Sequence, residues 1–245
     1  MKKSVFVAVF ALLCCAGSVF AGTVGPVKSA VTTGGISLGI GYANVNVEWD
    51  KEGTSFPQTP EMASHQVFTQ LGFGTGHNWS ATLRGGAALI GVDDAYLVGG
   101  DLEADDAMPF VTLGLQGTVF DGEVLKVGPY VQGSYFFTAV EDDVTKTATK
   151  ETIAYRDMWD AKVGCNFQVE LEGAQLYAGP MYYISEVEVK NSQAGVGSSI
   201  ATLEEKDHFG FMAGIQWKLK RNLALELEVE QRSAVGVGLT LNKSF

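Results

Sequence analysis

The segment AVGVGLTLNKSF, Ala234–Phe245, decides how the rest of the chain is interpreted. Valine or leucine occupies every second position from Val235 to Leu241, with glycine or threonine between them. Because the side chains of a β-strand point alternately to opposite faces, this segment predicts a strand with one apolar face. Termini are usually polar and frayed, so an apolar strand that leads to Phe245 predicts a partner that covers it.

The same two-residue period recurs along the chain and predicts ten strands. The clearest is 159–171, where apolar residues alternate with polar residues or glycine, a pattern that no helix would produce. The predicted strands are 35–49, 63–75, 79–91, 107–119, 124–137, 159–171, 175–189, 209–219, 223–229 and 235–241. In the first strand the apolar positions shift from Tyr42 to Val45, which predicts a β-bulge after Ala43. Merging the last two strands with their neighbours would give eight strands.

The connections form a second pattern, in which short and long ones alternate until the last hairpin. Tight turns are predicted at GHN (76–78), DGE (121–123), EGA (172–174) and KRN (220–222), and QRSA (231–234) is also short. The connections 50–62, 93–106, 139–152 and 191–207 are long. An antiparallel barrel with short turns at one end, long loops at the other and both termini at the turn end has this arrangement.

The first residues predict export. MKK is a positively charged start, residues 4–17 are apolar but too few to span a bilayer as a helix, and Val19 and Ala21 fit cleavage before Gly22. We therefore expect a signal peptide at 1–21 and one barrel domain at 22–245. Cleavage would leave 15 basic and 28 acidic residues, a net charge of −13. Such a surface argues against nucleic acid as a partner, because phosphate binding needs a basic surface.

The two faces of the strands predict that the apolar face meets lipid and the other face lines a lumen. Tryptophans lie in the apolar register near both rims, as interface aromatics would. The predicted interface aromatics are Trp49, Trp79, Trp159, Trp217 and Phe245. The opposite face is rich in glycine, which would relieve crowding inside a narrow barrel. That face also carries charges of both signs, which predict an internal ion-pair network. The predicted lumen charges are Arg84, Lys126, Asp160, Lys162, Glu170, Lys218, Glu226, Glu228 and Glu230.

The last strand resembles the C-terminal signature of Gram-negative outer-membrane β-barrels, in which alternating apolar residues lead to a final aromatic residue. The matching residues are Val235, Val237, Leu239, Leu241 and Phe245, whereas Lys243 stands where that class usually has an apolar or aromatic residue. The resemblance implies an all-β, antiparallel up-and-down transmembrane barrel in the bacterial outer membrane. Its implied partners are lipid, lipopolysaccharide and the barrel-assembly machinery, which reads the last strand. A soluble exported barrel or sandwich with its apolar face inward is the alternative.

No motif predicts catalysis, a cofactor or a metal centre. His77 lies in a predicted turn, and His65 and His208 lie near the loop ends of their strands on opposite faces. The nearest enzymatic resemblance is to omptin proteases, ten-stranded barrels with an Asp-Asp and an Asp-His pair at the rim. In that family one residue separates the members of each pair. Here Asp93–Asp94 and Asp207–His208 are adjacent, so their side chains would point to opposite faces.

The acidic run DLEADD, residues 101–106, could bind Ca²⁺ or Mg²⁺ and bridge to lipopolysaccharide phosphates. Its carboxylates are Asp101, Glu103, Asp105 and Asp106, without the spacing of an EF-hand. A solvated acidic loop is the simpler interpretation.

The expected function is that of a non-enzymatic surface barrel. Ten strands leave a lumen that side chains can largely fill, so a narrow porin-like channel or a structural barrel is expected in place of a wide pore. The alternative is an adhesin or ligand-binding barrel that acts through its long acidic loops. An omptin-like protease is the third interpretation.

Overall fold

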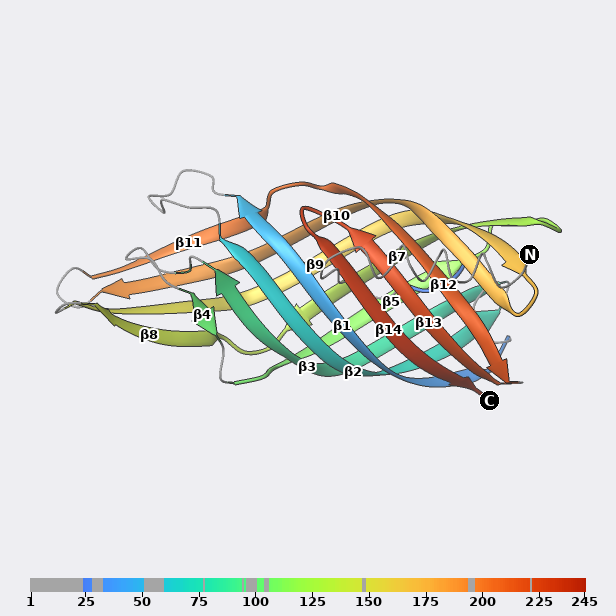
Figure 1. The fold of residues 1–245 in the computed structure, drawn as a ribbon, viewed down its shortest axis with the longest axis horizontal. Helices are drawn as coiled ribbons and strands as arrows, with labels where there is room; N and C mark the ends of the chain where they lie inside the picture. The colour runs from blue at the N-terminus through green and yellow to red at the C-terminus, as the bar shows by residue number, and fades with distance from the viewer. Residues whose placement is uncertain are drawn as a thin grey trace, which may run out of the picture.

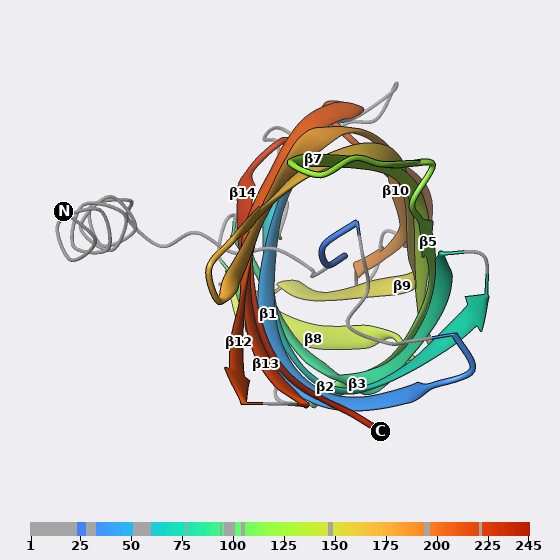
Figure 2. The same cartoon turned by 90° about the vertical axis from the view of Figure 1, so that its right-hand side faces the viewer.

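The computed structural model describes residues 24–27, 33–50, 60–76, 78–93, 95, 101–103, 106–146, 149–193, 197–220 and 222–245. The predicted signal peptide, 1–21, lies outside them. Ten long antiparallel strands in these residues close into a barrel (Figures 1 and 2). They are β1 (Ile36–Asp50), β2 (Glu61–Gly76), β3 (Trp79–Asp93), β5 (Met108–Gly117), β7 (Leu125–Phe136), β9 (Thr149–Leu171), β10 (Ala174–Gln193), β12 (Phe209–Lys220), β13 (Leu223–Gln231) and β14 (Val235–Ser244). Each pairs with the next, and β14 pairs with β1, which confirms the predicted fold class.

Four shorter strands accompany the ten: β4 (Leu102–Glu103), β6 (Phe120–Asp121), β8 (Val140–Lys146) and β11 (Gly197–Glu205). β8 and β11 pair with the long ends of β9 and β10 and project beyond the barrel at one end (Figure 1). We call this the loop end and the opposite end, with the short connections, the turn end. The prediction that 139–152 and 191–207 are loops was therefore wrong in part, because both contain β-strand.

The predicted β-bulge in the first strand is absent from the described residues. β1 pairs with β2 in one uninterrupted register from Ile36 opposite Phe73 to Glu48 opposite Glu61. Val45 and Val47 therefore face the same side as Ala43, which is the inside of the barrel. The apolar pattern changes phase because the lumen itself becomes apolar toward the loop end.

The outer face of the barrel is apolar. Val67, Leu113 and Phe209 are 65%, 63% and 78% exposed, whereas Glu228 on the opposite face is 0% exposed. A closed barrel leaves no unpaired strand edge in hydrocarbon, so this surface suits a bilayer. Among the described residues, no helix has the length and hydrophobicity needed to cross a membrane.

Glycines on the inner face make room for large lumen side chains. A Cβ at Gly214 would overlap the ring of Tyr177, and a Cβ at Gly164 would lie 2.6 Å from the Cζ atom of Tyr130. Both tyrosines are 3% exposed, and their side chains lie on the lumen side of the wall. Glycine here is a packing requirement of a narrow, filled barrel.

At the loop end, β11 bridges the wall above the short β13–β14 hairpin. β1 pairs with β14 only as far as Asn44, and at Trp49 and Asp50 it pairs with β11 instead. Ser233, at the tip of the hairpin, accepts a hydrogen bond from Glu48 N at 3.1 Å and donates one to Glu205 at 2.8 Å. These bonds join the hairpin tip to the strands above it and seal the wall at this point.

Candidate functional site: the lumen

A segment that precedes the barrel in the chain lies inside it. Residues Val24–Val27 occupy the lumen at the turn end, as the view along the barrel shows (Figure 2). The backbone N–H groups of Val24 and Gly25 donate to the carboxylate of Glu228 at 2.7 and 3.0 Å. The carbonyls of Pro26 and Val27 accept bonds from Gln116 at 3.1 Å and Thr118 at 3.2 Å. These bonds hold the segment inside the turn-end half of the lumen.

Three glutamates of β13 form an acidic layer above this segment. Glu228 accepts a hydrogen bond from the Tyr177 hydroxyl at 2.9 Å, and Glu226 accepts one from Gln216 at 3.1 Å. Glu230 forms an ion pair with Lys162, with 2.6 Å between Nζ and Oε2. The i, i+2 spacing of the glutamates along β13 places all three on the inner face, where each is at most 4% exposed.

Arg232 is a functional candidate that the sequence did not indicate. Its guanidinium forms a bidentate ion pair with Glu205. It also lies 3.8 Å from the carboxylate of Asp160, and its central carbon is 4.6 Å from the centroid of the Tyr183 ring. It is 8% exposed although it sits in the short QRSA connection, which sequence patterns treat as a solvated turn. Arg232 stands two residues after Glu230 and so continues the inward register of β13. That register predicts burial only if the wall continues past the turn, and β11 provides this continuation.

Gln70 and Arg84 are cross-strand neighbours on the inner face of β2 and β3, and we call this hydrogen-bonded pair the partition. The Nε of Arg84 donates to Gln70 at 2.6 Å, and Gln70 donates to Asn242 at 3.3 Å. Gln70 lines a cavity of about 30 Å³ on the turn-end side, shared with Glu226 and the N-terminal segment. Arg84 lines a second cavity, of about 40 Å³, on the loop-end side. The two cavities are thus separated by one hydrogen-bonded pair.

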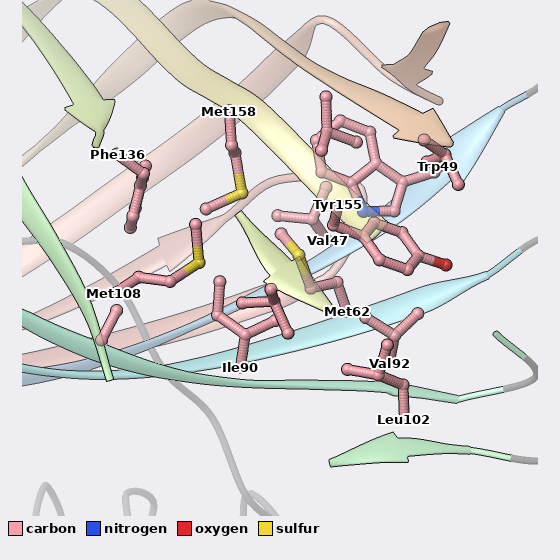
Figure 3. Close-up of a cluster of buried hydrophobic side chains, with 14 of the residues drawn as sticks. Val47, Trp49, Met62, Ile90, Val92, Leu102, Met108, Phe136, Tyr155 and Met158 are labelled. Atoms are coloured by element: carbon pink, nitrogen blue, oxygen red, sulfur yellow. The ribbon is translucent and has the colours of Figure 1, made fainter. Parts of the chain in front are cut away.

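The loop-end half of the lumen is filled by an apolar cluster (Figure 3). Trp49 is 0% exposed and packs in this cluster with Val47 and Met62. The prediction that Trp49 is an interface aromatic was therefore wrong. Because β1 keeps its register, Trp49 shares the inward face of Ala43, and the apolar lumen covers it.

The other predicted aromatics lie in the outward register. Trp79, Trp159 and Trp217 are half-buried, and Phe245 is 68% exposed. The backbone N–H of Phe245 donates to the carbonyl of Ile36 at 2.9 Å, which ties the end of the chain to β1.

The predicted lumen charges divide by depth. Arg84, Lys162 and the three β13 glutamates are enclosed, Asp160 is half-buried, and Lys126 is paired with Asp121 near the turn end. Glu170 and Lys218 are exposed at the turn end, so the prediction that they line the lumen is corrected. Both stand within two residues of a turn, where the inner face opens to solvent.

The histidines and acidic residues that were considered for catalysis or metal binding form no common centre in the described part of the chain. His65 is exposed and bonded to the Tyr42 hydroxyl at 2.8 Å, while the His208 ring lies at a tilt beside that of Tyr182, with 5.9 Å between the ring centroids. His77, Asp94 and Asp105 lie outside the described residues. Asp101 and Asp106 are exposed, and no three His, Cys, Asp or Glu residues among those described are placed to hold a metal ion.

Neither a protein-family model nor a curated protein matches the sequence. Several solved structures match at low identity. The outer membrane protease OmpT from Escherichia coli is 9% identical, with a TM-score of 0.48 over 89% of this chain and 100% of that one. The translocator domain of the autotransporter NalP from Neisseria meningitidis is 10% identical, with a TM-score of 0.49 over 100% and 94%. The outer membrane protein OprG from Pseudomonas aeruginosa is 13% identical, with a TM-score of 0.47 over 88% and 98%. Likeness at this level transfers no activity from these proteins to this chain.

Proposed function

We propose that this chain is a bacterial outer-membrane barrel that acts as a narrow channel for small solutes and is closed in this structure. The observation that carries the proposal is the pair of lumen cavities separated by the Gln70–Arg84 hydrogen bond. A purely structural barrel would gain stability by packing this region without cavities, because each void loses contacts for the atoms that line it. The turn end would face the periplasm, as in other barrels of this class.

Two polar features close the channel at its middle and at its turn end, and the apolar cluster fills its loop end. The Gln70–Arg84 pair blocks the middle of the lumen, and the segment Val24–Val27 blocks the turn end through its bonds to Glu228. Both blocks are made of hydrogen bonds between groups that water can also satisfy. Opening these two blocks exchanges their hydrogen bonds for bonds to water, whereas opening the loop end requires apolar side chains of the cluster to move aside.

Conductance across planar bilayers tests the proposal. We expect brief, small openings for the unmodified barrel. Glu228→Gln, which removes the charge that receives Val24 and Gly25, should make openings more frequent, and Gln70→Ala should enlarge them. Glu61→Gln, an exposed change at the start of β2, is the matched control and should leave conductance unaltered. Membrane fractionation and heat-modifiable migration on gels would establish that each variant is inserted and folded.

The channel is rejected if both lumen variants are folded and inserted yet show no current above the bare membrane. The alternative function, binding to host or matrix molecules, would then be favoured. β8, β9, β10 and β11 form a sheet that projects beyond the barrel at the loop end. This sheet offers a surface for binding host or matrix molecules. Removing β8 and its partner segment of β9 should then abolish cell adhesion while leaving the barrel folded.

A further inference from the structure

Arg84 is a buried cation whose guanidinium has more hydrogen-bond donors than the one bonded to Gln70. It is 4% exposed, its Nε donates to Gln70, and its guanidinium is centred 5.1 Å from the ring of Phe68. The bond to Gln70 uses Nε and leaves the two terminal Nη atoms out of it. A guanidinium presents five donors in a planar fork, and a carboxylate matches that fork with two parallel bonds.

The loop-end cavity is lined by more cationic than anionic side chains. Its lining includes the cations Arg84, Lys162 and Arg232 and one carboxylate, Asp160. Lys162 is already paired with Glu230, and Arg232 with Glu205. Arg84 is therefore the cation of this cavity without an ion pair among the described residues. The β13 glutamates do not line this cavity, although Glu226, Glu228 and Glu230 act on Arg84 through space.

The other side of the same cavity is apolar. Val47, Met62, Phe110, Phe136 and Met158 line it and belong to the cluster that fills the loop-end half of the lumen (Figure 3). The cavity of about 40 Å³ has room for a group the size of a few water molecules, such as a carboxylate. Methionine side chains are flexible and adapt to varied shapes, so Met62 and Met158 can move to admit an apolar body behind the head group.

We propose that this cavity binds a small organic carboxylate with an apolar body, which enters from the loop end and places its carboxylate on Arg84. The apolar body then lies among the methionines and phenylalanines above. This inference goes beyond the proposed channel, because binding requires no passage through the partition. It assigns Arg84 as the residue that selects an acid over a neutral molecule of the same shape.

Equilibrium binding to the folded barrel in detergent micelles tests the inference, with benzoate as the probe and isothermal titration as the measurement. Benzamide has nearly the same shape without the charge, and acetate has the head group without the ring. We expect benzoate to bind more tightly than both. Arg84→Gln should weaken benzoate binding by at least about tenfold, as expected when a charge-assisted hydrogen bond is lost.

Two further variants make the test decisive. Lys206→Gln removes one positive charge at the exposed Glu48 pair and should leave benzoate affinity unchanged. Ser134→Leu keeps Arg84 but fills part of the cavity that Ser134 lines, so it should also abolish binding, even if Arg84→Gln fails to fold. The inference is overturned if benzamide binds as well as benzoate, or if benzoate affinity is the same in a folded Arg84→Gln or Ser134→Leu barrel. Because no current is measured, a failed channel proposal leaves this result intact.

Discussion

Gly85 and Gly86 are neighbours in β3 that face opposite sides of the wall. A Cβ at Gly86 would overlap the carbonyl oxygen of Val67 and lie 2.8 Å from the Cβ of Phe68, whereas a Cβ at Gly85 would meet nothing within 4 Å. We predict that Gly86→Ala lowers the free energy of unfolding by roughly 1–3 kcal/mol, the usual effect of overpacking. Urea unfolding in detergent micelles, followed by tryptophan fluorescence, measures the change.

Gly85→Ala is the matched control for this pair. It adds the same methyl group on the outer face, so its unfolding free energy should equal that of the parent or exceed it slightly. Equal destabilisation by both substitutions would show that strand propensity, and not the filled lumen, decides the effect.

Arg232 should be far more important to stability than its place in a turn suggests. Arg232→Met leaves Glu205 and Asp160 without their shared cation in a closed interior. We predict a loss of roughly 3–5 kcal/mol in unfolding free energy, because an uncompensated buried charge remains. The transition temperature of heat-modifiable migration would report the same loss.

An exposed pair provides the comparison for Arg232. Lys150 and Thr152 hold the pKa of the Asp143 carboxyl below its ordinary value on the β8–β9 hairpin. Lys150→Met should leave the transition unmoved, because solvent screens such a pair. An Arg232→Met barrel as stable as Lys150→Met would contradict the buried network.

The sequence could indicate which residues face inward only where the lumen is polar. Glu228 alternates with leucines along β13, and its enclosure follows from that period once the apolar face is assigned to lipid. Trp49 could not be placed in this way, because toward the loop end of β1 the apolar residues, Val47 and Trp49 among them, face the lumen, and polar residues lie between them. Arg232 continues the even-numbered inward register of Glu228, but it lies in a turn, where a strand period is not expected to hold. Its burial depends on a contact with Glu205 of β11, 27 residues earlier in the chain.

Among the elements, β14 closes the barrel through its pairing with β1 and its final residue. We propose that the assembly machinery recognises this strand and predict that Phe245→Ala lowers the amount of folded barrel in cells by several-fold. Refolding of the same purified variant into detergent should proceed almost normally, because only one backbone bond beyond β14, from Phe245 to Ile36, is at stake. Fractionated membranes, compared on unboiled gels, give the cellular amount.

Lys243→Ala serves as the control for the last strand, because Lys243 already departs from the C-terminal signature. It should leave the amount of folded barrel unchanged. If Phe245→Ala also assembles normally, recognition of the final aromatic residue is excluded for this chain.

The ten barrel strands could be predicted because lipid and lumen impose opposite polarities on alternate residues. β8 and β11 could not, since neither face of these strands is in lipid. Ile200 and Ser198 of β11 are both exposed, and no period distinguishes them from a loop. These strands form because β9 and β10 continue beyond the barrel and offer free edges to pair with.

For the whole molecule, the decisive property is that the apolar surface faces outward. Two single-tryptophan barrels would test this orientation. One retains Trp49 and the other retains Trp217, and phenylalanine replaces the remaining tryptophans. In bilayers with brominated acyl chains, the fluorescence of the Trp217 barrel should be quenched, because Trp217 lies in the outward register. Trp49 is enclosed in the lumen, so its fluorescence should not change. If only the fluorescence of Trp49 were quenched, the face assigned here to the lumen would be the one that meets lipid, and the prediction would be wrong.

The position of Val24–Val27 also dictates an order of events in maturation. The groups that hold this segment lie on separate parts of the barrel. Glu228 is in β13, Gln116 is near the end of β5, and Thr118 follows directly after β5. Its receptor does not exist until the cylinder has closed. A stretch that precedes every strand in the chain is therefore the last to reach its resting place, and its arrival marks a finished barrel.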